Sequence, residues 1–146
     1  GTDEVPLRRE LDILDRYLTL EKVRFADRLT VHVEADDDAR GARVPAWMLQ
    51  PLVENALKHG IAPKPGPAEI RVHASREDDR LVVRVQDDGI GPEAAGARGR
   101  THGTGVGLAN TRARLDALYG RDASLTLASG ADGGAVATLS LPYRPA

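Results

Sequence analysis

Two alternating runs of apolar residues, joined by a short polar link, constrain the fold of this chain most. Ile70 and Val72 alternate with polar residues in the first run, and Leu81 and Val85 do so in the second. Residues 77–80, between the two runs, are all charged and suit a turn. Two strand patterns with such a link predict an antiparallel hairpin, so a sheet forms at least part of the fold.

A first helix is predicted from about Pro6 to Arg28. Its leucines are spaced four, three and four residues apart, which places them on one stripe of a helix. These residues are Leu7, Leu11, Leu14 and Leu18. A narrow apolar stripe suits either a partner helix or the core of its own domain, and the pattern leaves both open.

Two further helices are predicted, at about residues 45–59 and 106–119, from apolar residues at helical spacing. Pro51 lies awkwardly within the second helix, so it indicates either a kink or a late start. Gly60 and Gly120 suit the ends of these helices.

Three more strands complete the predicted elements. Leu29–Glu34 alternates, another strand begins at Leu125, and a last one covers Ala137–Leu141. Residues 88–104 are rich in Gly, Ala and Arg with few apolar anchors, and we interpret them as a mobile loop. The order of elements favours a mainly antiparallel sheet with helices on one face.

Composition excludes several classes of protein. The chain has 146 residues, which fits one domain with a single core. Its net charge is -2 with both signs spread along the sequence, which argues against a general nucleic-acid binder. It has no cysteine, so disulfides, thiolate metal sites and a cysteine nucleophile are excluded. No apolar run has the length of a membrane span.

The first candidate motif lies on the second helix. Asn55, Lys58 and His59 follow an i, i+3, i+4 spacing and should share one face. An amide oxygen, an ammonium and an imidazole together suit a metal–phosphate group, because Mg²⁺ prefers oxygen ligands and shares its shell with phosphates. The simpler alternative is a solvated Asn55 beside a surface ion pair of Glu54 with Lys58, which the motif alone favours.

The second motif follows the predicted hairpin. Asp87 closes the strand, and Gly89 and Gly91 permit sharp backbone geometry and close approach of a ligand. A carboxylate here can accept a hydrogen bond from the exocyclic amine of adenine, whereas guanine offers a carbonyl at that position. The alternative is a turn with a solvated aspartate, since Asp-Gly is a common turn pair.

A third motif places three alternating glycines directly before the third helix. It reads Gly103-Thr104-Gly105-Val106-Gly107-Leu108. Backbone amides at a helix N-terminus attract phosphate. The spacing matches neither the dinucleotide-binding Gly-x-Gly-x-x-Gly pattern nor the Walker pattern, and a flexible linker is the alternative.

The three motifs in this order resemble the GHKL superfamily, whose members bind ATP on the Bergerat fold. Asn55 matches the N box, and residues 87–91 and 103–108 match the two glycine boxes. The flanking sequences are similar to those of LytS-type sensor histidine kinases. They are LQPLVENALKHGI (49–61), GVGLANTRARLDALYG (105–120) and PLRRELDILDRYLTLEKVRFADRL (6–29).

This resemblance implies an α/β two-layer sandwich, preceded by an N-terminal helix. A mainly antiparallel mixed sheet would carry helices on one face. Residues 1–28 would be a helical remnant of the dimerisation and phosphoacceptor region, and residues 29–146 would be the ATP-binding catalytic domain.

The resemblance also implies roles for the polar residues. Asp87 would accept a hydrogen bond from the adenine amine, and Asn55 would bind Mg²⁺ between the phosphates. Lys58 and His59 would lie near phosphate oxygens. Glu54 would accept a proton during transfer or orient the nucleophile.

The glycine boxes would shape the rest of the ATP site. Gly89 and Gly91 would let the backbone approach the nucleotide, and residues 92–104 would form a lid. The lid hinge and further nucleotide contacts would come from Gly103, Thr104, Gly105, Val106, Gly107 and Leu108. Ala135 departs from the family, which often has Thr or Ser there.

The implied function is transfer of the γ-phosphoryl group of ATP to a histidine on an upstream segment, for relay to a response regulator. ATP and Mg²⁺ are the expected cofactors. None of the 4 histidines has the Pro-His-Phe context of the family's acceptor, so this chain alone is not expected to autophosphorylate. The expected partners are the phosphoacceptor helix of the same or the partner chain and a response regulator, in a homodimeric parent.

Contact with nucleic acid or membrane is not expected of this chain. Its expected location is cytoplasmic, also where the parent is an inner-membrane sensor. The alternative functions are a GHKL-type ATPase, a protein serine kinase, and a nucleotide-binding regulatory module without catalysis.

Overall fold

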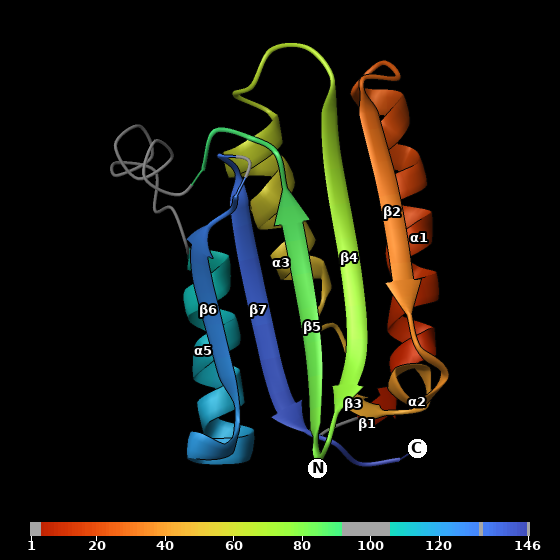
Figure 1. Cartoon of the computed structure of the whole chain (residues 1–146), viewed down its shortest axis with the longest axis vertical. Helices are drawn as coiled ribbons and strands as arrows, with labels where there is room; N and C mark the ends of the chain where they lie inside the picture. The colour runs from red at the N-terminus through yellow and green to blue at the C-terminus, as the bar shows by residue number, and fades with distance from the viewer. Residues whose placement is uncertain (1–3, 92–105, 132, 146) are drawn as a thin grey trace.

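The computed structural model describes residues 4–91, 106–131 and 133–145 of the chain. A five-stranded sheet with the strand order β2-β4-β5-β7-β6 forms its centre (Figure 1). The strands are β2 (Leu29–Ala35), β4 (Ala68–Glu77), β5 (Arg80–Asp87), β6 (Ser124–Ser129) and β7 (Ala135–Pro142). β2 pairs with β4 in parallel, and the other pairings are antiparallel. The predicted mixed, mainly antiparallel sheet is therefore confirmed.

The predicted hairpin lies in the middle of this sheet. Val72 of β4 is paired with Val85 of β5, and Ile70 is paired with Asp87. On its other side Asp87 is paired with Ala135 of β7. The last residue of β5 is thus held between two neighbouring strands.

Helices on one face of the sheet form the second layer. They are α1 (Leu7–Arg24), α3 (Gln50–Asn55) and α5 (Val106–Tyr119), all behind the sheet in Figure 1. α3 continues directly into a π-helical segment, η1 (Ala56–Ile61), because its C-terminal residues keep helical backbone angles. The two-layer α/β sandwich is therefore confirmed.

The leucine stripe of α1 packs on its own domain. At most 3% of each leucine is exposed, and all belong to the same core as the sheet: Leu7, Leu11, Leu14 and Leu18. Each fully buried leucine stabilises the fold by roughly 2 kcal/mol relative to an exposed one. The helix ends at Arg24, earlier than predicted, because Ala26 and Asp27 adopt left-handed backbone angles (φ 52 and 65) that cannot continue a right-handed helix.

The second helix starts later than residue 45. A strand β3 (Arg43–Pro45) pairs antiparallel with a strand β1 (Glu4–Pro6), and neither strand was predicted. α3 then begins at Gln50, with Pro51 in its first turn, where a missing N–H leaves no helical hydrogen bond unmade. Of the two readings of Pro51, the late start is confirmed.

One local prediction was wrong, and one short helix was not predicted. Gly60 does not end the second helix, because it lies inside η1, which continues to Ile61. The polar stretch after β2 contains the unpredicted short helix, α2 (Asp37–Arg40). Asp36 caps that helix by accepting the Ala39 N–H at 2.7 Å.

The third helix has the predicted extent. Gly120 follows α5 with a positive φ of 59° and begins a 3₁₀ turn, η3 (Gly120–Asp122), which confirms the predicted stop. Within the described ranges, no helix has both the length and the apolar character needed to cross a bilayer.

Candidate functional site

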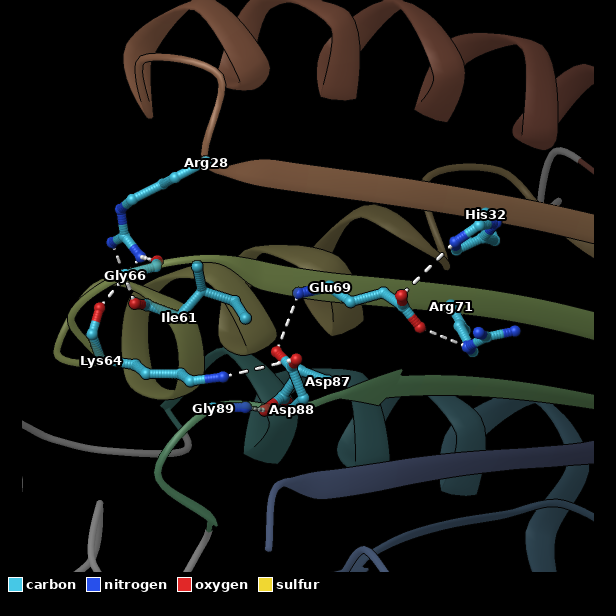
Figure 2. Close-up of polar contacts among 10 residues, drawn as sticks. All are labelled: Arg28, His32, Ile61, Lys64, Gly66, Glu69, Arg71, Asp87, Asp88 and Gly89. Atoms are coloured by element: carbon cyan, nitrogen blue, oxygen red, sulfur yellow. Dashed lines mark hydrogen bonds and ion pairs between the residues drawn. The ribbon is translucent and has the colours of Figure 1, made fainter. Parts of the chain in front are cut away.

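The Asp87 carboxyl group is the centre of the candidate site. Asp87 ends β5, and only 4% of it is exposed. Its Oδ1 accepts a hydrogen bond from the Gly89 N–H at 2.8 Å (Figure 2). Burial raises the pKa of this carboxyl, and hydrogen bonds from the N–H groups of Gly89 and Ala135 oppose the rise only in part. A buried carboxyl with a perturbed pKa at a strand end is a candidate functional group.

Two glycines bring the backbone of η1 against this carboxyl. A Cβ atom on Gly60 would lie 2.5 Å from Asp87 Oδ1, and one on Gly89 would lie 2.1 Å from the Gly60 carbonyl oxygen. The Ile90 N–H donates to that same carbonyl at 3.2 Å. A side chain at either position would force its neighbours to move, so η1 and the loop after β5 form one close-packed wall beside Asp87.

The β6–β7 turn packs against the same loop. Gly91 has a φ of 85°, and a Cβ on it would lie 2.6 Å from the Gly133 carbonyl oxygen. A Cβ on Gly134 would lie 1.8 Å from the Asp87 carbonyl oxygen. Gly89 and Gly91 thus approach protein backbone, which by itself requires glycine, and their contact with a nucleotide stays a prediction.

Two of the glycines that shape the site were not predicted to do so. Gly60 was predicted only to end a helix, and no role in the site was predicted for Gly134. Gly60 directly follows the polar residues of the first motif, and this position was the one sequence feature that could have indicated its role in the site. The chain has 15 glycines, and tertiary packing decides which of them approach Asp87.

The polar residues of the first motif lie where the α-helix widens into a π-helix. Asn55 ends α3, while Lys58 and His59 belong to η1, in which the Ala62 N–H donates to the Leu57 carbonyl at 2.8 Å. Asn55 and His59 are half-buried and Lys58 is exposed. π-turns are rare and recur at functional sites. The three side chains thus belong to the segment that ends beside the buried carboxyl.

Lys58 and His59 offer different chemistry. Burial lowers the pKa of His59, and the neighbouring Lys58 lowers it further. Since an ordinary histidine already titrates below pH 7, His59 is neutral at neutral pH. His59 therefore offers a neutral N–H donor, and Lys58 offers a positive charge.

Glu54 does not form the alternative ion pair with Lys58. Its Oε1 instead accepts a hydrogen bond from Gln50 Nε2 at 2.9 Å, and no salt bridge joins it to any described residue. The exposed Glu54 carboxylate lies near Tyr17 of α1. There the pKa of Tyr17 is raised to about 12, first by burial, then by Glu21 and Glu54.

The third motif is described only in part. Three of its residues lie outside the described ranges: Gly103, Thr104 and Gly105. The predicted lid, residues 92–104, lies outside them too. Val106 begins α5, Gly107 is exposed with no described atom within 4 Å of an added Cβ, and Leu108 is buried in the core at 1% exposure.

A metal ion at this site would need further ligands from a bound phosphate compound and from water. In the part of the chain that the structure describes, no cluster of three or more His, Cys, Asp or Glu side chains could hold a metal ion. The predicted metal ligand, Asn55, supplies one amide oxygen. That fits Mg²⁺, which usually takes most of its shell from phosphates and water.

Comparisons with known proteins show the family of this chain. Residues 42–145 match the model of the histidine kinase-, DNA gyrase B-, and HSP90-like ATPase family. Sensor histidine kinase YesM of Bacillus subtilis is 31% identical over 142 residues, which are 97% of this chain and 24% of YesM. Sensor protein LytS of Staphylococcus saprophyticus is 38% identical over 147 residues, with 96% of this chain and 25% of LytS covered. The chain thus spans about a quarter of the length of the curated relatives it matches.

A solved structure shows the same fold. The catalytic domain of histidine kinase ThkA matches with a TM-score of 0.67 at 22% identity, over 100% of this chain and 99% of that one. The family model covers well over half of the chain, so this chain belongs to the histidine kinase-, DNA gyrase B-, and HSP90-like ATPase family. Membership of this family implies that the chain binds ATP.

Proposed function

We propose that this chain is the ATP-binding catalytic domain of a sensor histidine kinase. In that role it transfers the γ-phosphoryl group of ATP to a histidine outside this chain, for relay to a response regulator. The observation that carries the proposal is the buried Asp87 carboxyl, enclosed by glycine backbone next to the polar N-box helix. The similarity to the sensor kinases YesM and LytS supports it.

Asp87 fits the adenine end of ATP. Gly89 occupies one lone pair of Oδ1, and an ionised carboxylate has further acceptor sites for an exocyclic amine. Gly60 lacks the Cβ atom that would lie 2.5 Å from Asp87 Oδ1. Adenine supplies the required donor, whereas guanine would set a carbonyl oxygen against the carboxylate.

The N-box helix fits the phosphate end of ATP. Asn55 would give an amide oxygen to Mg²⁺, Lys58 would give a positive charge, and His59 would give a neutral N–H. Mg²⁺, when bound, neutralises charge on the phosphates. Residues 103–108 would add backbone donors at the start of α5.

Glu54 is the candidate for handling the proton. As the acceptor imidazole bonds to the γ-phosphorus and ADP leaves, the other ring nitrogen must lose its proton, and Glu54 would take it or orient the ring. Glu54 is exposed and next to Asn55, so an acceptor helix can reach it.

The same proposal assigns different roles to two parts of the chain. Residues 1–28 would continue the dimerisation and phosphoacceptor region of a homodimeric parent, and residues 29–146 would bind ATP. The buried leucines of α1 support a firm connection between the two.

A transfer assay tests the proposed function. The chain is joined to the acceptor-bearing segment of its parent and given γ-labelled ATP with Mg²⁺. We expect acid-labile, base-stable label on that segment, and none on this chain by itself. Acid-stable label would instead indicate a serine kinase. Free phosphate without labelled protein would indicate an ATPase, and ATP binding without turnover would indicate a regulatory module.

A further inference from the structure

Arg28 makes three hydrogen bonds that the proposed function does not use. Its guanidinium donates to the carbonyls of Lys64 at 2.9 Å, Gly66 at 2.8 Å and Ile61 at 3.1 Å (Figure 2). These carbonyls belong to the end of η1 and the loop that follows it. A rigid planar fork with five N–H donors can serve three carbonyls at once, which an ammonium cannot do with the same geometry.

Arg28 is itself held firmly in place. It follows the left-handed turn at Ala26 and Asp27 that ends α1. Its guanidinium lies over the ring of the buried Phe25, 5.1 Å from the ring centroid. Its carbonyl accepts the Ala68 N–H at 2.8 Å, where β4 begins. Arg28 is thus fixed to α1 and to the sheet at once.

The segment that Arg28 holds leads directly to the candidate site. Ile61 follows Gly60, whose backbone packs against the Asp87 carboxyl. Lys64 Nζ lies 3.4 Å from Asp88 Oδ2 (Figure 2). The other oxygen of Asp88 accepts a backbone N–H of β4 at 2.8 Å. A shift of residues 60–66 would therefore reach the surroundings of Asp87 both through the backbone and through the Lys64–Asp88 ion pair.

We propose that Arg28 is a positioning residue for adenine recognition, which it supports by fixing residues 60–66 against Asp87. This inference rests on the proposed ATP site. Arg28 does not itself reach the carboxyl, and it acts through the peptide segment it holds. It also ties the end of α1 to the adenine end of the site, so a displacement of α1 would weaken adenine binding.

The test compares Arg28→Gln and Arg28→Lys with a control, Arg24→Gln, in the full chain. Arg24 leaves the same helix end and also lies over Phe25, at 5.4 Å, but its one side-chain hydrogen bond among the described residues is to Glu21. Calorimetry measures the Kd of adenosine and of a non-hydrolysable ATP analogue with Mg²⁺, well below each melting temperature. We expect Arg28→Gln to weaken both ligands equally, on the order of tenfold. Arg28→Lys should lie in between, and Arg24→Gln should match the wild type.

Wild-type affinity for adenosine in folded Arg28→Gln would overturn the inference, and so would a loss confined to the ATP analogue. If Arg28→Gln does not fold, Arg28→Lys decides by the same criteria. Hydrogen exchange of the Ile90 amide, which donates to the Gly60 carbonyl, is a second measurement without ligand. It should be faster in the Arg28 variants than in Arg24→Gln, and equal protection would contradict the positioning role. Failure of the wild type to bind any adenine compound would refute the ATP site instead.

Discussion

At the residue scale, the burial that suits Asp87 to adenine recognition also lowers the stability of the fold. The carboxyl loses hydration on folding, and its raised pKa expresses that cost. A raised pKa means that the folded state holds the proton more tightly than the unfolded state. The stability of the fold therefore decreases as pH rises from about 4 towards the raised pKa. Below that range the carboxyl is neutral in both states, and the cost vanishes.

Asp87→Asn should therefore separate binding from stability. We expect ATP affinity to fall roughly ten- to hundredfold, because a hydrogen bond to a charged acceptor is lost. The difference in melting temperature, Asp87→Asn minus wild type, should be more positive at neutral pH than at about pH 4. Calorimetry and thermal melts measure the two effects, with the exposed Asp116→Asn as control. Unchanged ATP affinity would contradict the role given to Asp87.

Gly60→Ala tests the close approach of η1 to the same carboxyl. The new Cβ would lie 2.5 Å from Asp87 Oδ1, so the carboxyl or the helix must move. We expect a stability loss of about 1–3 kcal/mol from overpacking, together with weaker ATP binding. Gly41→Ala is the control, since its nearest atoms would be 3.8 Å away. Denaturant unfolding measures the stability, and titration measures the ATP affinity. A wild-type ATP affinity would show that the close approach of Gly60 to Asp87 does not matter for binding.

Single residues differed in how far the sequence predicted them. Asp87 and Asn55 could be singled out because each falls in a motif of fixed spacing that matches a known family. The role of Gly60 could not be predicted, because a glycine near the end of a helical pattern usually stops the helix. Its contact with Asp87 depends on how η1 meets the end of β5, and local sequence does not contain that information.

At the element scale, α1 is part of the core and not an appendage. Leu14→Ala should cost about 2–5 kcal/mol, because it leaves a cavity between α1 and the rest of the core. Leu20→Ala is the matched control on the same helix, since Leu20 is 72% exposed, and its effect should stay within about 0.5 kcal/mol. Denaturant unfolding measures both. Equal, small effects would mean that the catalytic domain folds without α1.

Long periodic elements were predictable, and short or irregular ones were not. The hairpin and α5 were predicted because alternation or helical spacing repeats several times within each. β1, β3 and α2 are too short for a regular spacing of apolar residues to repeat within them. The π-helical character of η1 has no signature in apolar spacing.

At the scale of the whole molecule, the site joins three segments far apart in sequence. The end of β5, segment η1 and the β6–β7 turn meet at one end of the sheet (Figure 1). The strand order β4-β5-β7 puts Asp87 in the middle of that end. The fold class was predictable because the order of the motifs matched a family. The backbone contacts of Gly60, Gly89 and Gly134 were not predictable, because they arise only when the sheet brings these segments together.

The most direct test of the ATP site is calorimetric titration of the chain with ATP and with GTP, each with and without Mg²⁺. The geometry at Asp87 predicts that ATP binds, that Mg²⁺ strengthens the binding, and that GTP binds at least about tenfold more weakly. Equal affinity for ATP and GTP would contradict recognition of adenine by Asp87. Absence of binding by either nucleotide would contradict the ATP site itself.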